Sequence, residues 1–381
     1  MTLRLPRDLW GVYRQPPQFR FGTVTSVSPG ICTVQVAGGE IPAIYFKNAA
    51  PSVGDFVSVQ RQSVVSYLMT APAAGALWVG DSALDGIWRV PLTGQAPAFY
   101  GIPGTGVYGV VEGPDKAIWA ATQGSASPYT GSVFRMVSSG TDIGQATSAV
   151  LANSAPTAIC VGPDGNLWVA DSNGGVWRVT LAFGSTFYAL SGSYPTGIVT
   201  GPDNNLWVVD QNRGLWKVTT GGSAELFPLA TPSPNDNLGS GPGGYLWAPG
   251  SSTTAGYVIR MATDGTATNI QIWPYQSDAV AAVDGPDGRA WVVAEWIYAS
   301  ATQPTSPLTG GTFAVSTDGV VEYYPFPTLA GQAPLAITVG ADKRLWIADN
   351  SGAVWALTTS GAFTKYALGT GANPSSITAG P

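Results

Sequence analysis

The chain has 381 residues, a formal net charge of −6 at neutral pH, and 10% charged against 45% hydrophobic residues. It holds 49 glycines and 30 prolines but no histidine, which excludes every catalytic or metal-binding arrangement that depends on imidazole. The N-terminus lacks the pattern of a signal peptide and the apolar runs are broken by proline and glycine, so we expect neither a signal peptide nor a membrane span.

Residues 1–20 carry arginines and prolines without a strand pattern, and we expect an extended arm. Residues 1–75 hold six Lys/Arg and three Asp/Glu, which gives them a net charge of +3. Because the whole chain has a net charge of −6, residues 76–381 have a net charge of −9. Because arginine is favoured at protein interfaces, the arm is predicted to anchor the chain to a neighbouring protein. The anchoring residues expected are Arg4, Arg7, Trp10 and Arg14.

Residues 21–70 show five short runs of alternating apolar and polar residues separated by turn residues. Five strands in so short a stretch predict a small closed β-barrel of the OB type, followed by a linker at residues 71–75. No interleaving of basic and aromatic residues follows the arm, so we expect no nucleic acid as a partner. The runs are 21–27, 31–36, 41–46, 55–59 and 63–68.

Residues 76–381 contain a repeated tryptophan, usually preceded by leucine and a Gly-Pro-Asp turn. The spacings are 41, 49, 39, 40, 44 and 55 residues, close to the roughly 45 residues of one four-stranded propeller blade. The prediction is an all-β chain whose main domain is a seven-bladed β-propeller. The repeated tryptophans are Trp78, Trp119, Trp168, Trp207, Trp247, Trp291 and Trp346.

The unit at residues 156–190 displays the four strands of a blade, which we call A to D in chain order. A second aromatic follows nine residues after the first, as Trp177 follows Trp168, and we expect both to fill the space between blades. Residues 373–381 read as a strand A and its turn with no strand B after them, whereas Trp78 marks a strand B with no strand A before it. The C-terminal segment is therefore predicted to complete the first blade and close the ring.

The repeat from Pro156 to Asp171, nearly duplicated from Pro195 to Asp210, resembles that of the virginiamycin B (streptogramin) lyase-like propellers. The likeness covers residues 76–381 and implies seven blades. It also implies a lyase that opens a cyclic depsipeptide by elimination, with a histidine as general acid/base beside a magnesium ion. This chain has no histidine, so the implied base is missing.

Aspartates three residues after the repeated tryptophans are the acidic residues that the repeat itself supplies. An aspartate in a turn commonly binds the turn's own backbone amides, and we favour that role over catalysis. No ligand loop of recognisable spacing is present. We therefore expect no catalytic residue, no metal, no cofactor and no enzymatic activity, and the aspartates are Asp81, Asp171, Asp210 and Asp349.

Ligand binding is expected on the face that carries the D–A and B–C connections, because these vary in length while the A–B turns stay short. The longest B–C insertions are 121–131 and 294–311. Exposed aromatics beside amides and carboxylates suit stacking and hydrogen bonding to sugars, although the aromatics of the second insertion serve equally well to pack their own loop. The candidate ligand-binding residues are Tyr129, Tyr194, Asn235, Asp236, Glu295, Trp296 and Tyr298.

The runs at 21–27, 32–36 and 51–59 look like the small OB-like barrels of bacteriophage tail and baseplate proteins. This likeness implies a minor tail or tail-tip protein of the virion, present in several copies, whose barrel attaches to other tail proteins. The propeller would then present a binding face to neighbouring virion proteins or to a host surface polysaccharide. Two alternatives remain open: a lyase or hydrolase that uses Asp or Glu and a metal, and a cellular, extracellular carbohydrate-binding propeller.

Overall fold

The structure is a computed structural model, and its described residues form two compact units, within residues 1–74 with 92–95 and within 75–91 with 96–381. In the first unit five strands are described by their backbone alone. Residues 92–95 are also described, and in the second unit the described ranges are 75–91, 96–102, 106–124, 130–140, 142–229, 233–234, 237–252, 254–297, 310–327 and 333–381. None of the described helices has the length and apolar character needed to span a membrane.

The first unit contains a closed barrel with the strand order β1-β2-β3-β5-β4. Strands β3 and β5 pair in parallel, and β1 closes the barrel by antiparallel pairing with β4. Strand β5 continues to Pro72, within the segment 71–75 that was predicted as a linker. The strands are β1 (Phe19–Ser28), β2 (Ile31–Val36), β3 (Gly39–Ile44), β4 (Phe56–Arg61) and β5 (Tyr67–Pro72).

The second unit consists of seven antiparallel sheets, the blades, numbered here in chain order from the sheet that contains β6. Blade 1 contains β34 (Pro374–Gly380), β6 (Ala76–Asp81), β7 (Gly86–Pro91) and β8 (Ala98–Gly101). Blade 2 contains β9 (Val107–Glu112), β10 (Ile118–Thr122), β11 (Thr130–Met136) and β12 (Ala146–Ala152). Blade 3 contains β13 (Pro156–Val161), β14 (Leu167–Asp171), β15 (Gly175–Val179) and β16 (Ser185–Ala189).

The other four blades follow the same plan, with an extra short strand and a 3-10 helix in blade 5. Blade 4 contains β17 (Pro195–Thr200), β18 (Leu206–Asp210), β19 (Gly214–Val218) and β20 (Ala224–Pro228). Blade 5 contains β21 (Ser233–Pro234), β22 (Gly239–Gly241), η3 (Pro242–Gly244), β23 (Tyr245–Ser251), β24 (Gly256–Met261) and β25 (Ala267–Trp273). Blade 6 contains β26 (Ser277–Asp284), β27 (Ala290–Ile297), β28 (Gly311–Val315) and β29 (Val321–Pro325), and blade 7 contains β30 (Pro334–Val339), β31 (Leu345–Asp349), β32 (Ala353–Leu357) and β33 (Phe363–Ala367).

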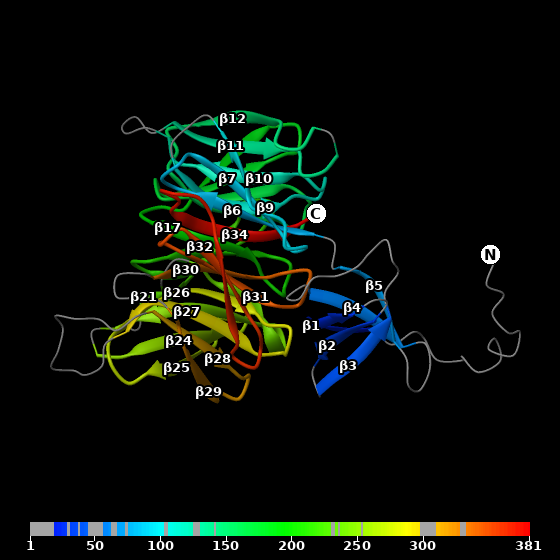
Figure 1. Cartoon of the computed structure of the whole chain (residues 1–381). Coiled ribbons are helices and arrows are strands. Elements are labelled where there is room, and N and C mark those ends of the chain that lie inside the picture. Colours follow the sequence, from blue (N-terminus) through cyan, green and yellow to red (C-terminus); the bar gives the residue numbers. More distant parts are fainter. Residues whose placement is uncertain are drawn as a thin grey trace, which may run out of the picture. The chain divides into compact units, whose positions relative to one another are not determined.

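The first strands of the blades contact one another in an unbroken circle, which confirms the predicted seven-bladed ring. Each of these inner strands touches the inner strand of the next blade, from β9 through β13, β17, β22, β26, β30 and β34 back to β9. The C-terminal strand β34 pairs with β6 and so completes blade 1 (Figure 1). The backbone amide of Ser82 also donates to the carbonyl oxygen of Asn373 at 3.1 Å. The predicted closure of the ring by the C-terminus is confirmed.

The repeated tryptophans form the core between blades, and all seven are at most 1% exposed. In blade 3, Trp168 packs with residues of strands β13 and β17 from two neighbouring blades. Its Nε1 donates to Asp164 Oδ1 at 3.0 Å in the A–B turn. Burial raises the pKa of the Asp164 carboxyl, but hydrogen bonds from Arg178, Asn166 and Trp168 outweigh burial and hold it at about 2. This carboxylate therefore stays ionised and ties the turn to two strands.

The aspartates at the ends of the B strands are buried and bind the B–C turns, which confirms the structural role favoured for them. Asp171 Oδ1 accepts the backbone amides of Ala155 and Asn173, each at 2.9 Å, and Oδ2 accepts Trp177 Nε1 at 2.7 Å. One carboxylate thus joins the B–C turn, the loop before strand A and the second aromatic of the blade. Asp81, Asp210 and Asp349 also accept the second aromatic's Nε1 in their blades.

Candidate functional site

A cavity of about 460 Å³ opens at the end of the propeller where the inner strands begin and the second strands end. Because neighbouring strands run antiparallel, these two ends share one face of the ring, the face that carries the D–A and B–C connections. We call this cavity the funnel. Its lining residues are Ser82, Tyr108, Gln123, Thr157, Tyr194, Thr196, Gln211, Asn237, Val280, Glu295, Leu335 and Ser375.

Repeated β-bulges place side chains in the funnel. In blade 3, Pro156 pairs with Asp171 and Ala158 pairs with Ala170, so Thr157 is an extra residue with no partner across the ladder. A bulge redirects the side chain of its extra residue and is common beside functional sites. The register leaves an extra residue at the same place in four other blades, and these residues also line the funnel: Tyr108, Thr196, Leu335 and Ser375.

Blade 6 departs from the repeat because it contains two bulges. Asp278 pairs with Trp296 and Ala279 pairs with Ala294, which leaves Glu295 as the extra residue of β27. The next shift leaves Val280 as the extra residue of β26. Blade 6 thereby contributes an inner-strand residue, as other blades do, together with a carboxylate from the second strand.

Further polar side chains enter the funnel from the residues that directly follow the second strands. Ser82, Gln123 and Gln211 follow β6, β10 and β18. Backbone hydrogen bonds hold Asn237 beside blade 6. Its backbone amide donates to the Val280 carbonyl oxygen, and its backbone carbonyl oxygen accepts the backbone amide of Ala282, both at 3.1 Å. The described wall is therefore mostly neutral and rich in hydrogen-bonding groups.

Two tyrosines expose a substantial part of their rings at the funnel: Tyr108 is 40% and Tyr194 46% exposed. The backbone amide of Tyr194 donates to Asp210 Oδ1 at 3.4 Å, and the same carboxylate accepts Trp216 Nε1 at 3.1 Å. Asp210 is thus a positioning residue that connects the tyrosine to the blade core. Exposed aromatic faces in a concave, polar wall form a surface that suits stacking against a ligand.

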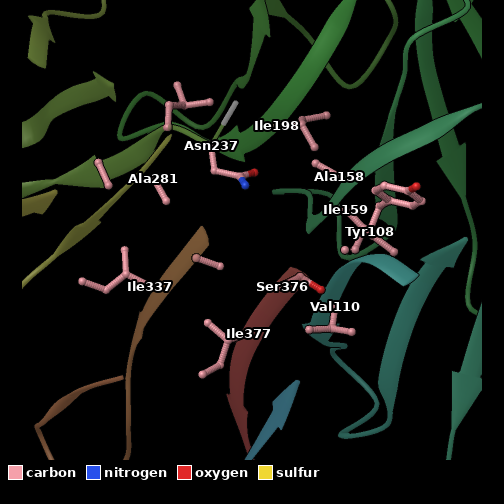
Figure 2. Close-up of a pocket in the computed structure, with 14 residues that line it drawn as sticks. Tyr108, Val110, Ala158, Ile159, Ile198, Asn237, Ala281, Ile337, Ser376 and Ile377 are labelled. Atoms are coloured by element: carbon pink, nitrogen blue, oxygen red, sulfur yellow. The ribbon is translucent and has the colours of Figure 1, made fainter. Parts of the chain in front are cut away.

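Below the funnel the central opening narrows to a smaller cavity of about 150 Å³, which shares Tyr108 and Asn237 with the funnel. Figure 2 shows the short apolar side chains that surround this opening, together with Tyr108 and Asn237. Among them are Val110, Ile159, Ile198, Ile337 and Ile377. The hydrogen-bonding chemistry of the site therefore lies in the funnel.

The structure brings together two of the predicted ligand-binding residues, Tyr194 and Glu295, in the funnel wall. Trp296 is not among the lining residues and lies half-buried opposite Asp278 in the blade 6 ladder. The remaining predicted residues lie outside the described part of the chain, namely Tyr129, Asn235, Asp236 and Tyr298, as do the arm residues Arg4, Arg7, Trp10 and Arg14.

Sequence reasoning missed Tyr108, Gln123 and Gln211, which the funnel geometry reveals. Two signals in the repeat point to such positions. One is the residue after the proline that begins an inner strand, as Thr157 follows Pro156. The other is the fourth residue after the repeated tryptophan, which is glutamine, serine or glutamate where it lines the funnel.

The donor groups of the funnel do not fit the magnesium site that the lyase resemblance implies. No group of three or more His, Cys, Asp or Glu that could hold a metal ion occurs among the described residues. The described funnel wall offers one carboxylate, Glu295, and otherwise amides, hydroxyls and apolar groups, whereas magnesium is usually held by carboxylates together with substrate or water oxygens.

A comparison with protein families matches residues 55–305 to the virginiamycin B lyase family, which covers more than half of the chain. The chain belongs to this family. The match begins within the predicted front barrel and includes Tyr108, Tyr194 and Glu295. A search of curated proteins finds no match.

Solved structures related to this virginiamycin B lyase family member confirm the propeller fold. A catalytically inactive virginiamycin B lyase from Staphylococcus aureus, solved with quinupristin, is 19% identical with a TM-score of 0.59, over 77% of this chain and 89% of that one. A proposed 6-phosphogluconolactonase from Bacteroides uniformis is 14% identical with a TM-score of 0.59, over 81% of this chain and 99% of that one. Hydrazine synthase from Kuenenia stuttgartiensis is 16% identical with a TM-score of 0.58, over 72% of this chain and 90% of that one.

These findings correct the prediction that the chain is not an enzyme. The family whose model matches is a family of lyases, and the similar structures include virginiamycin B lyase and a proposed lactonase. The prediction rested on the missing histidine and on the structural role given to the repeated aspartates. It gave too little weight to the resemblance to a lyase family and to carboxyl groups outside the repeat, which can also transfer protons.

Proposed function

We propose that the propeller binds a saccharide in the funnel. The observation that carries this proposal is the pairing of two exposed tyrosine rings, Tyr108 and Tyr194, with a wall of amide and hydroxyl groups in one concave site. Sugar rings stack on aromatic faces through their C–H groups, and their hydroxyls exchange hydrogen bonds with amides and hydroxyls. The cavity of about 460 Å³ is within the size range of small-ligand sites.

A second candidate function is the cleavage of the bound ligand with Glu295 as the acid/base group. Membership of a lyase family and the position of this carboxylate in the funnel favour it. In an elimination, the carboxylate takes a proton from carbon, a carbon–carbon double bond forms and the carbon–oxygen bond to the leaving group breaks. In a hydrolysis, the carboxylate takes a proton from the attacking water instead.

Replacing Tyr108 by alanine is expected to weaken saccharide binding at least about tenfold, because a stacking face of the funnel is lost. Glu295→Gln should leave an uncharged saccharide bound but stop any cleavage. Both are measured with purified protein, binding by calorimetry and cleavage by mass spectrometry of neutral oligosaccharides and of quinupristin. Hydrolysis adds the mass of one water, whereas ring opening by elimination leaves the mass of quinupristin unchanged and shifts its chromatographic retention.

Tyr366→Ala is the matched control, because this tyrosine lies on the outer strand β33 against Trp346 and outside the funnel wall. Its saccharide affinity should equal that of the unchanged chain. Equal affinities for the Tyr108→Ala and Tyr366→Ala variants would contradict a binding site in the funnel.

We also propose that the front barrel is of the OB type and attaches the propeller to a bacteriophage tail. The resemblance of residues 21–59 to barrels of tail and baseplate proteins supports this, and so does the strand order β1-β2-β3-β5-β4 with β1 paired to β4. Mass spectrometry of purified virions should find the chain in a fixed ratio to other tail proteins. Its absence from virions, with presence in the medium of a cellular host, would favour an extracellular propeller of cellular origin instead.

A further inference from the structure

We propose that the funnel prefers saccharides that carry an N-acetyl group, and that the side-chain amide of Asn237 recognises this group. The inference rests on the proposed saccharide binding and names the substituent that the same site selects. It is carried by the position of Asn237, which lines both the funnel and the smaller cavity below it, here called the lower cavity. This residue therefore lies where the two cavities meet.

The backbone of Asn237 is held in place independently of its side chain. It forms a parallel bridge with Ala281 of β26, through the two backbone hydrogen bonds of 3.1 Å to Val280 and Ala282. Two residues later, Gly239 lies so close to β26 that a β-carbon added to it would be 2.8 Å from the Ala282 carbonyl oxygen. Because these contacts use the main chain, the side chain of Asn237 is positioned before a ligand binds.

The side-chain amide of Asn237 is available to a ligand. It has no hydrogen-bond partner in the described part of the chain, and Figure 2 shows it pointing into the central opening. Other polar groups of the funnel wall use their donors within the fold. Thr157 Oγ1 donates to the Pro195 carbonyl oxygen at 3.1 Å. Ser375 Oγ donates to the Gly80 carbonyl oxygen at 3.2 Å.

The lower cavity next to Asn237 is lined mainly by apolar side chains. Apart from Tyr108, Asn237 and Ser376, its lining residues have apolar side chains or, at Gly109, no side chain. The volume of about 150 Å³ is ample for a methyl group, whose transfer from water to apolar surroundings is favourable. A hydroxyl in the same place would face these side chains without a partner, which is unfavourable.

The shape of an N-acetyl group matches this pairing of an amide with an apolar cavity. Its amide is planar and trans, so the methyl points away from the sugar ring while the carbonyl oxygen points sideways. When the group enters the opening with its methyl first, the methyl reaches the lower cavity and the carbonyl oxygen faces the wall. Asn237 Nδ2 then donates a hydrogen bond to that oxygen, and the sugar hydroxyls stay in the funnel.

Calorimetry with the full chain and three trisaccharides of the same linkage tests this inference. They are the trimers of glucose, N-acetylglucosamine and N-formylglucosamine. The N-acetyl trimer should bind about tenfold or more tightly than the glucose trimer. The N-formyl trimer should have an intermediate affinity, because it keeps the carbonyl oxygen but lacks the methyl group. This comparison needs no variant of the protein.

Replacing Asn237 by aspartate tests the role of the side-chain amide. The preference for the N-acetyl trimer should fall to within about twofold, because a carboxylate oxygen replaces the Nδ2 donor and repels the acetyl oxygen. The affinity for the glucose trimer should change little, since a carboxylate still accepts hydroxyl groups. Asn212→Asp is the matched control, because it makes the same change at an exposed B–C turn residue outside the funnel wall. It should keep the full preference.

Three results would overturn the inference while saccharide binding stands. The first is a preference that survives in Asn237→Asp, and the second is a glucose trimer that binds the unchanged chain as tightly as the N-acetyl trimer. The third is an equal affinity for the N-formyl and N-acetyl trimers, which would contradict the placement of the methyl in the lower cavity. If none of the three trimers binds, the proposed function fails and the inference fails with it.

Discussion

Removal of residues 373–381 will destabilise the whole propeller, at a cost of roughly 5 kcal/mol or more, which is comparable to the total stability of many domains. The reason is that β34 is the inner strand of blade 1. Its pairing with β6 runs from Pro374 opposite Asp81 to Gly380 opposite Ala76, and β34 also contacts the inner strands β9 and β30 of the flanking blades. Without it, blade 1 exposes a free sheet edge and the ring is open.

Chemical denaturation followed by tryptophan fluorescence measures this effect, because seven buried tryptophans report on the core. A synthetic peptide of residues 373–381, added in excess, should restore part of the lost stability by binding at the vacant edge. The single change Ile377→Ala, at a side chain that is 9% exposed, serves as a milder test with an expected cost of about 2 kcal/mol. A truncated chain that unfolds at the same denaturant concentration as the full chain would contradict closure by β34.

Replacing Asp171 by alanine is expected to lower the free energy of unfolding by about 3 kcal/mol. The side chain is 1% exposed and accepts three hydrogen bonds, from the Ala155 and Asn173 amides and from Trp177 Nε1. Alanine would leave these donors without a partner in a region largely closed to water, and an unmet buried donor costs more than the bond itself contributes. Urea denaturation of both proteins measures the difference.

Asp264→Ala is the control for this change, since Asp264 is an exposed turn aspartate that accepts one backbone amide, from Thr266 at 2.9 Å. Its unfolding midpoint should move little. If the two substitutions lower the free energy of unfolding equally, the buried carboxylate of Asp171 contributes no more to stability than the exposed one of Asp264.

The propeller could be predicted from the sequence because many contacts that define a blade form between residues of the same repeat. Asp164 and Trp168 are an example, because they are four residues apart and lie in one hairpin. Trp168 Nε1 donates a hydrogen bond to Asp164 Oδ1 at 3.0 Å. Contacts of such short range repeat with the sequence, so the blade length and the position of the core tryptophans can both be read from it. The closure by residues 373–381 was predictable for a related reason, since a strand A without a strand B has one vacant place in the ring.

The funnel was harder to predict because its wall depends on strand register. Tyr108 lies within an apolar run and reads as an ordinary strand residue, yet a bulge makes it the extra residue of β9 and exposes 40% of it. Glu295 was predicted for its place in a long insertion, but it lies within β27, where the second bulge of blade 6 places it in the funnel. A shift of one residue reverses which face a side chain occupies, and the sequence pattern alone does not show where such a shift occurs.

A crystal structure of the propeller with a bound neutral oligosaccharide tests most directly whether the residues at the bulges form the ligand-binding site. We predict a sugar ring against Tyr108 or Tyr194 inside the funnel, with sugar hydroxyls at hydrogen-bonding distance from the amide and hydroxyl groups of the wall. A saccharide bound instead at the A–B turns or along an outer strand, with the funnel filled by water, would contradict it.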